Sequence, residues 1–97
     1  MELKIQAIHF DATEKLQAFI EKKMQRFAKR NEDVTKVEFT LKVVKPETNL
    51  NKQVSVQVSL PGDTLYAEKT CDTFEDAVLQ CIESLDRPLE KYKEKRR

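Results

Sequence analysis

The chain has 97 residues and a formal net charge of +1; 39% of its residues are hydrophobic and 36% are charged. This length allows one domain with one modest core and excludes two independently folding units. No apolar run approaches the roughly 20 residues that a membrane-spanning helix needs, and the N-terminus lacks the apolar stretch of a secretory signal. We therefore expect a single-domain cytoplasmic protein that makes no membrane contact.

The charges are unevenly distributed along the chain. Formal charges are +4 over residues 14–30, −5 over residues 70–86 and +4 over residues 87–97. The near-neutral total alone would argue against a nucleic-acid partner, so the inference depends on where the cations gather. Charge runs are also common on ordinary solvated helix faces, and that alternative stays open at this point.

The first predicted elements are a strand and a helix. Apolar and polar residues alternate over residues 1–8, and this period of two predicts a strand with one buried face. Asp11 followed three residues later by Glu14 is a capping-box pattern, which predicts a helix over about residues 12–30. The apolar positions of this helix are Leu16, Phe19, Ile20, Met24 and Phe27.

The first helix is predicted to carry a basic face. At about 100° per residue, its cations fall within one arc of roughly 120°, beside the apolar arc that must face a core. These cations are Lys15, Lys22, Lys23, Arg26, Lys29 and Arg30. Lys23 lies at the edge of the apolar arc, between Phe19 and Phe27. Its ammonium either reaches water past a packed aliphatic stem or binds a phosphate.

Three more strands are predicted after the first helix. Alternating residues indicate strands over residues 36–43 and 54–60, with a loop over residues 45–52 between them. Residues 61–63, Pro-Gly-Asp, predict a tight turn in which the glycine can take a positive φ. Residues 64–69 then form a fourth strand, which completes a hairpin with the third.

The last predicted element is a second helix near the C-terminus. Either Thr73 with Asp76 or Asp72 with Glu75 can cap it. Its apolar positions are Phe74, Val78, Cys81, Leu85, Leu89 and Tyr92. Pro88 lies inside this helix and removes one main-chain amide donor, so we expect a bend there.

Arg87, Lys91 and Lys95 recur every four residues and therefore lie on one side of the second helix. Cations near a helix C-terminus also interact favourably with the helix dipole, but this effect fades within the last turn and does not account for Arg87. Tyr92 belongs to the apolar side and is expected in the core rather than as a base-stacking platform. Two basic stripes favour a polyanionic partner.

The predicted order is β-α-β-β-β-α, which indicates an α+β fold. The first strand reaches the second through a helix and is expected to be parallel to it, in a four-stranded mixed sheet. Two roughly parallel helices then pack on one face, as in a double-stranded-RNA-binding domain. The other face carries Ser, Thr, Gln, Lys and Glu and is expected to face water.

The sequence offers little catalytic chemistry. His9 is the one histidine and has no recognisable partner, so we expect a surface or capping role. Cys71 and Cys81 do not show the spacing of a four-ligand zinc site and are interpreted as structural. A single glycine excludes most glycine-rich phosphate loops. We expect no enzymatic activity, catalytic residue, metal, cofactor or small-molecule substrate.

Four stretches carry a family resemblance: residues 9–16 (HFDATEKL), 19–23 (FIEKK), 73–78 (TFEDAV) and 89–95 (LEKYKEK). With the element order, they resemble the bacterial ribosome hibernation-promoting factors, which are ribosome-associated translation inhibitors. The resemblance covers nearly the whole chain. It implies a stationary-phase stress factor that is monomeric when free. It also implies binding to the small ribosomal subunit and its RNA, where the protein occludes the channel for messenger and transfer RNA.

The resemblance also implies which residues bind ribosomal RNA. The positions that match the family are Lys22, Lys23, Arg26, Arg87, Lys91, Lys93 and Lys95. Lys29 and Arg30 of the first basic face complete the predicted RNA-binding set. The chain departs from the family pattern at Asp86 and Pro88, both in the second helix. Residues 1–97 are expected to form a single ribosome-binding domain of the short form, without a C-terminal dimerisation domain.

Two other functions stay open from the sequence. A general double-stranded-RNA-binding module would bind free duplexes without a ribosome. A protein-interaction domain would instead use the wet sheet face or a strand edge.

Overall fold

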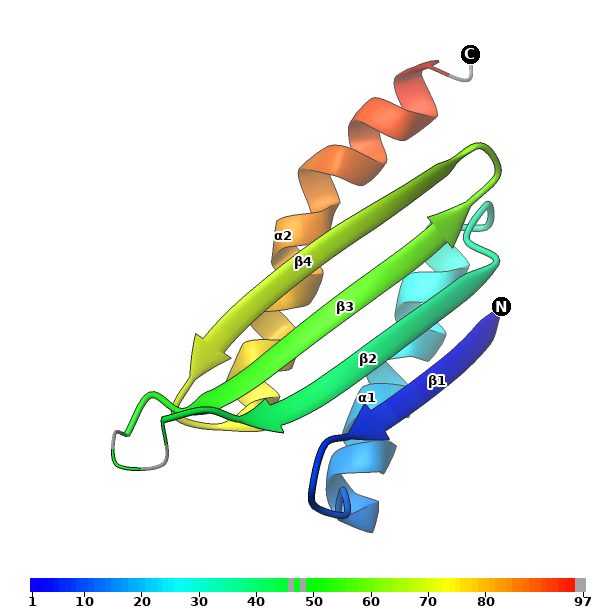
Figure 1. Ribbon diagram of the computed structural model, residues 1–97. Helices are drawn as coiled ribbons and strands as arrows, with labels where there is room; N and C mark the ends of the chain where they lie inside the picture. The colour runs from blue at the N-terminus through cyan, green and yellow to red at the C-terminus, as the bar shows by residue number, and fades with distance from the viewer. Residues whose placement is uncertain (46, 48, 96–97) are drawn as a thin grey trace.

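Four strands and two helices make up the part of the chain that the structure, a computed structural model, describes: residues 1–45, 47 and 49–95 (Figure 1). The elements are β1 (Glu2–Ala7), α1 (Glu14–Arg30), β2 (Lys36–Val43), β3 (Lys52–Leu60), β4 (Asp63–Cys71) and α2 (Phe74–Lys95). The predicted order β-α-β-β-β-α is confirmed. The predicted loop over residues 45–52 includes residues 46 and 48, which lie outside the described residues, and β3 begins two residues earlier than predicted.

The strands form one mixed sheet in the order β1-β2-β3-β4. β1 is parallel to β2, as the helical crossover predicts, while β2–β3 and β3–β4 are antiparallel. Figure 1 shows both helices behind the sheet, running in the same general direction. The opposite face, called the open sheet face below, is left to solvent, so the predicted α+β arrangement is confirmed.

The core lies between the sheet and the two helices. In β2, Val37, Phe39 and Leu41 are fully buried and alternate with Glu38 and Thr40, which are only partly buried. The largest fully buried side chains come from α1, β2 and α2: Phe27, Phe39, Ile20, Met24, Leu41 and Leu85. Burying each of them contributes about 1.5–3 kcal/mol of transfer free energy. This apolar face therefore fixes which side of each helix points outward.

The helix caps differ in part from the prediction. The backbone N–H of Leu16 donates to the Thr13 hydroxyl at 3.1 Å, and Thr13 itself has an extended backbone, so it is the N-cap of α1. The predicted capping box of Asp11 and Glu14 was wrong, because the chain turns helical only at Glu14. In α2, the N–H of Asp76 donates to the Thr73 hydroxyl at 3.1 Å, which selects the first of the two predicted caps.

The turn between β3 and β4 positions the end of α2. Leu60 pairs with Asp63, which leaves Pro61 and Gly62 at the centre of the turn, and Gly62 has φ +75°. Proline followed by a glycine at positive φ is typical of a type II turn. The Tyr92 hydroxyl donates to the Pro61 carbonyl at 2.8 Å. This bond anchors α2 four residues beyond Pro88, and the helix continues through the proline to Lys95.

Thr13→Ala should lower the free energy of unfolding by about 1 kcal/mol, because it leaves an N-terminal amide of α1 without its acceptor. Asp11→Ala should change it by less than about 0.5 kcal/mol, since Asp11 is exposed and outside the helix. Urea unfolding followed by circular dichroism measures both values. Equal losses for the two variants would contradict the assignment of Thr13 as the cap.

Candidate nucleic-acid interface

The basic residues of α1 lie on its solvent side, as predicted. Leu16, Ile20, Met24 and Phe27 bury the opposite side of the helix against the core. The α1 basic face comprises Lys15, Lys22, Lys23, Arg26, Lys29 and Arg30, which are all exposed except the partly buried Lys23. Within the described part of the chain, none of these six cations forms an ion pair. Their charge is therefore available to an external anion.

Phe19 belongs to this basic face rather than to the centre of the apolar arc. At about 100° per residue, it falls between Arg26 and Arg30 on the helix. It is partly buried, and the Lys23 ammonium lies 5.5 Å from the centre of its ring, within cation–π range. The predicted placement of Phe19 with the core residues thus holds only in part. The position of Lys23 agrees with a packed stem and a solvent-facing ammonium, and phosphate binding stays a prediction.

A groove of about 500 Å³ runs between the two helices. Four cations of the α1 basic face form one wall of this groove, and residues of α2 form the other wall. Its lining residues are Lys23, Arg26, Lys29, Arg30, Leu79, Ile82 and Glu83. Leu79 remains 37% exposed and presents apolar surface to this hollow. We call this hollow the interhelical groove.

Sequence reasoning did not find the α2 side of this groove. Leu79 and Ile82 lie off the apolar stripe that packs on the sheet, and only Ile82 is partly buried against the core. Two large apolar residues outside the main stripe of an amphipathic helix were the available signal. The periodicity of α2 alone could not show that Leu79 and Ile82 face the cations of α1.

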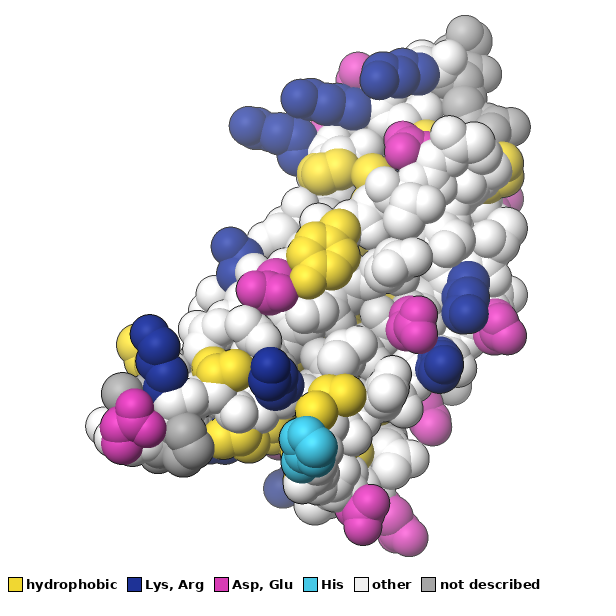
Figure 2. Space-filling model, viewed as in Figure 1, with side chains coloured by type: hydrophobic (Ala, Val, Ile, Leu, Met, Phe, Trp, Pro, Cys, Tyr) yellow, Lys and Arg dark blue, Asp and Glu magenta, His cyan; other side chains and the backbone are white. Residues whose placement is uncertain are grey.

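The cations of α2 do not merge with the α1 basic face into one surface. Arg87, Lys91 and Lys95 are all exposed, but at about 100° per residue Lys91 lies on the opposite side of α2 from the groove residue Ile82. Figure 2 shows Lys and Arg side chains projecting from the C-terminal half of α2 past β4. The two basic stripes predicted from the sequence therefore form two separate lines of cations. Three acidic residues, Glu83, Asp86 and Glu90, line the hollows on the α1 side of α2.

Lys93 differs from the other predicted RNA-binding residues. Its ammonium donates to the main-chain carbonyl of Arg30 at 2.8 Å, at the C-terminus of α1. A cation in this position satisfies a free carbonyl and interacts favourably with the helix dipole. Lys93 thus joins the end of α1 to α2, and it lies beside Asp86 and Glu90 in a smaller hollow of about 250 Å³.

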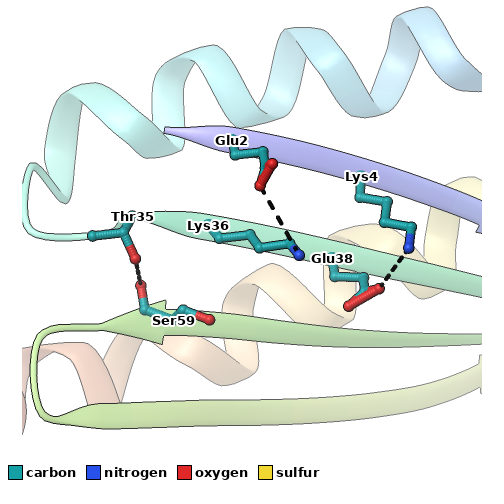
Figure 3. A network of polar contacts seen from close by, with 6 residues as sticks. All are labelled: Glu2, Lys4, Thr35, Lys36, Glu38 and Ser59. Carbon is teal, nitrogen blue, oxygen red and sulfur yellow. Dashed lines mark hydrogen bonds and ion pairs between the residues drawn. The ribbon is translucent and has the colours of Figure 1, made fainter.

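The open sheet face has compensated charges. Lys4 pairs with Glu38 at 3.6 Å and Lys36 pairs with Glu2 at 4.0 Å (Figure 3). Farther along the sheet, the Glu68 carboxylate accepts hydrogen bonds from Tyr66 at 2.8 Å and from Ser55 and Gln53 at 3.2 Å. Figure 2 shows basic and acidic side chains next to each other on this face. It has much less attraction for a polyanion than α1.

The comparisons with known proteins agree with this architecture. Residues 3–97 match the family model described as Sigma 54 modulation protein / S30EA ribosomal protein. The chain belongs to this family. It is 27% identical over 95 residues to a ribosome hibernation promoting factor of Pseudomonas putida, and the match covers 98% of this chain and 89% of that protein. The family resemblance predicted from the sequence is confirmed.

Two solved structures are similar to this one. A ribosomal subunit interface protein from Coxiella burnetii superposes with a TM-score of 0.85 and 26% identity, covering 96% of this chain and 98% of that one. The N-terminal domain of Thermus thermophilus Protein Y gives a TM-score of 0.79 with 19% identity, covering 95% and 99%. The second likeness concerns the fold alone. Both extend over nearly the whole sheet and both helices.

The two cysteines are free thiols inside the core of this family member. The Cys81 thiol donates to the Val54 carbonyl at 3.4 Å, and burial raises its pKa to about 11. Burial, with a smaller effect of Asp76, also raises the pKa of Cys71. Both thiols therefore stay protonated and unreactive at neutral pH.

Three smaller findings concern the remaining predicted features. His9 is exposed in the loop between β1 and α1, with φ +64°. Over residues 1–45, 47 and 49–95, no three His, Cys, Asp or Glu side chains lie close enough to hold a metal ion. In the same ranges, neither helix has the length and hydropathy to cross a bilayer.

Cys81 should make stability depend on alkaline pH. The native thiol keeps its proton up to a pKa of about 11, whereas the unfolded thiol loses it above 9.0, so unfolding becomes easier as the pH rises between these values. Relative to Cys81→Ala, the wild type should lose about 1–3 kcal/mol of unfolding free energy between pH 8 and pH 11. Urea titrations across this pH range measure the unfolding free energy of both proteins. The same dependence on pH in wild type and Cys81→Ala would contradict the prediction.

Proposed function

We propose that this protein binds the small ribosomal subunit through its cationic helix surfaces and inhibits translation by occupying the channel for messenger and transfer RNA. The observation that carries this proposal is the α1 basic face. Its six cations have no ion pair within the described residues, whereas the lysines at the edge of the open sheet face are paired. Unpaired cations on one side of a rigid helix suit a phosphate backbone, which supplies most of the affinity in such complexes.

Membership of the S30EA ribosomal protein family supports a ribosomal partner. The P. putida relative is named a ribosome hibernation promoting factor, and the C. burnetii structure is a ribosomal subunit interface protein. Binding and steric occlusion, rather than catalysis, carry the proposed function. Residues 1–97 act as one ribosome-binding unit in the cytoplasm, as a monomer before it meets the ribosome.

The shape of the molecule sets how RNA is bound. Its dimensions are 47 × 23 × 18 Å, and the α1 basic face is separated from the stripe of Arg87, Lys91 and Lys95 by the acidic side of α2. Two separate lines of cations contact two RNA segments rather than one continuous phosphate track. Because folded RNA is recognised largely through its shape and backbone, the spacing of the two lines selects the site. Lys93 supports this spacing by joining the helices.

Neutralising the α1 basic face should weaken binding and reduce its salt dependence. In the triple variant Lys22→Gln, Arg26→Gln, Lys29→Gln, each lost phosphate contact should lower the slope of log affinity against log salt concentration by about 1. Sedimentation with purified bacterial small subunits at several salt concentrations measures the slope.

The matched control neutralises three lysines of the open sheet face: Lys4→Gln, Lys36→Gln, Lys42→Gln. It removes the same formal charge from the chain, so the two variants differ only in where the charge was. We expect the control to bind with nearly the wild-type slope. Equal losses in both triple variants, or wild-type binding that does not respond to salt, would disprove the proposed mode of binding.

A further inference from the structure

The interhelical groove contains three kinds of chemistry side by side. Four cations lie along its α1 wall, two apolar side chains lie on its α2 side, and one carboxylate, that of Glu83, lies among them. Glu83 forms no ion pair with any described residue, and the four cations and this one carboxylate leave the groove with a formal excess of three positive charges. A site for phosphate alone needs cations and does not need an exposed leucine or a free carboxylate.

We propose that the interhelical groove receives one unpaired nucleotide of an RNA strand. This inference rests on the proposed function and specifies what α1 and α2 bind. The nucleobase lies on Leu79 and Ile82, the flanking phosphates contact Arg26 and Arg30, and the ribose hydroxyls donate to Glu83. The 2′-hydroxyl is a donor that RNA has and DNA lacks. Each chemical part of the groove thus has a counterpart in a single nucleotide.

The size and charge of the groove favour this occupant over two others. A volume of about 500 Å³ is within the range of small-ligand sites and accommodates one nucleotide. Bases in a duplex are stacked and paired, so a duplex would offer phosphates to Arg26 and Arg30 but leave Leu79 exposed to water. An acidic peptide would fit the cations, but its ionised carboxylates are acceptors only and cannot donate to Glu83 as a ribose hydroxyl does.

The test combines two kinds of footprinting on small ribosomal subunits, with wild type and Leu79→Ser. Hydroxyl radicals report protection of the RNA backbone, and base-specific reagents report access to unpaired bases. We expect wild type to protect the backbone and at least one unpaired base. Leu79→Ser should keep the backbone footprint, make that base reactive again and weaken binding about fivefold, which corresponds to about 1 kcal/mol.

Val43→Ser is the matched control, because Val43 is 39% exposed and lies outside the groove. It should leave both footprints and the affinity unchanged, and circular dichroism checks that each variant is folded. A backbone footprint with the same base reactivity for wild type and Leu79→Ser would overturn the nucleotide site alone. Weaker binding by Leu79→Ser without any change at a base would assign the groove to a protein side chain instead. Absence of any footprint would overturn the proposed function as well.

Discussion

The structure depends on a sheet with a single apolar face. Val37, Phe39 and Leu41 of β2, opposite Val56 and its neighbours in β3, form an apolar surface that the two helices cover side by side. Because both helices must pack there, their outer surfaces are adjacent and point the same way. Cations on the outside of α1 and apolar residues on the side of α2 therefore meet in one groove without any special connection between them.

A consequence of this layering is that the two faces of the molecule have different electrostatic character. Glu2 and Glu38 neutralise the lysines across from them on the open sheet face. The acidic residues of α1 are few, and the acidic segment of the chain lies at the start and middle of α2. Holding six cations on one helix face, with no ion pair to any residue that the structure describes, costs some stability through mutual repulsion. Such a cost is typical of surfaces kept for binding rather than for folding.

Much of the architecture could be predicted from the sequence, because local periodicity determines it. The alternation of apolar and polar residues predicted the bounds of β2 correctly. Helical spacing predicted the buried side of α1, except for Phe19. This residue lies between Arg26 and Arg30 on the helix and therefore among the cations. The rotation of α2 relative to α1 could not be predicted from local periodicity. It follows from how Leu85 and Leu89 pack on the sheet, a long-range contact that decides whether Lys91 joins the α1 basic face or points away from it. The cap of α1 was predicted at Asp11, a favoured capping residue, whereas the backbone geometry makes Thr13 the cap.

The separation of charge between the faces also bears on how the protein finds its target in a cell crowded with nucleic acid. With a net charge of only +1, the molecule has little attraction for any single polyanion at long range. Its charge asymmetry instead produces a torque that turns α1 toward the polyanion once the two are within about a Debye length, near 8 Å at physiological salt. The proposed mode of binding implies that the protein dissociates quickly from RNA that contacts one helix only. It should remain bound where a surface engages both lines of cations, so residence time rather than attraction at a distance discriminates between sites.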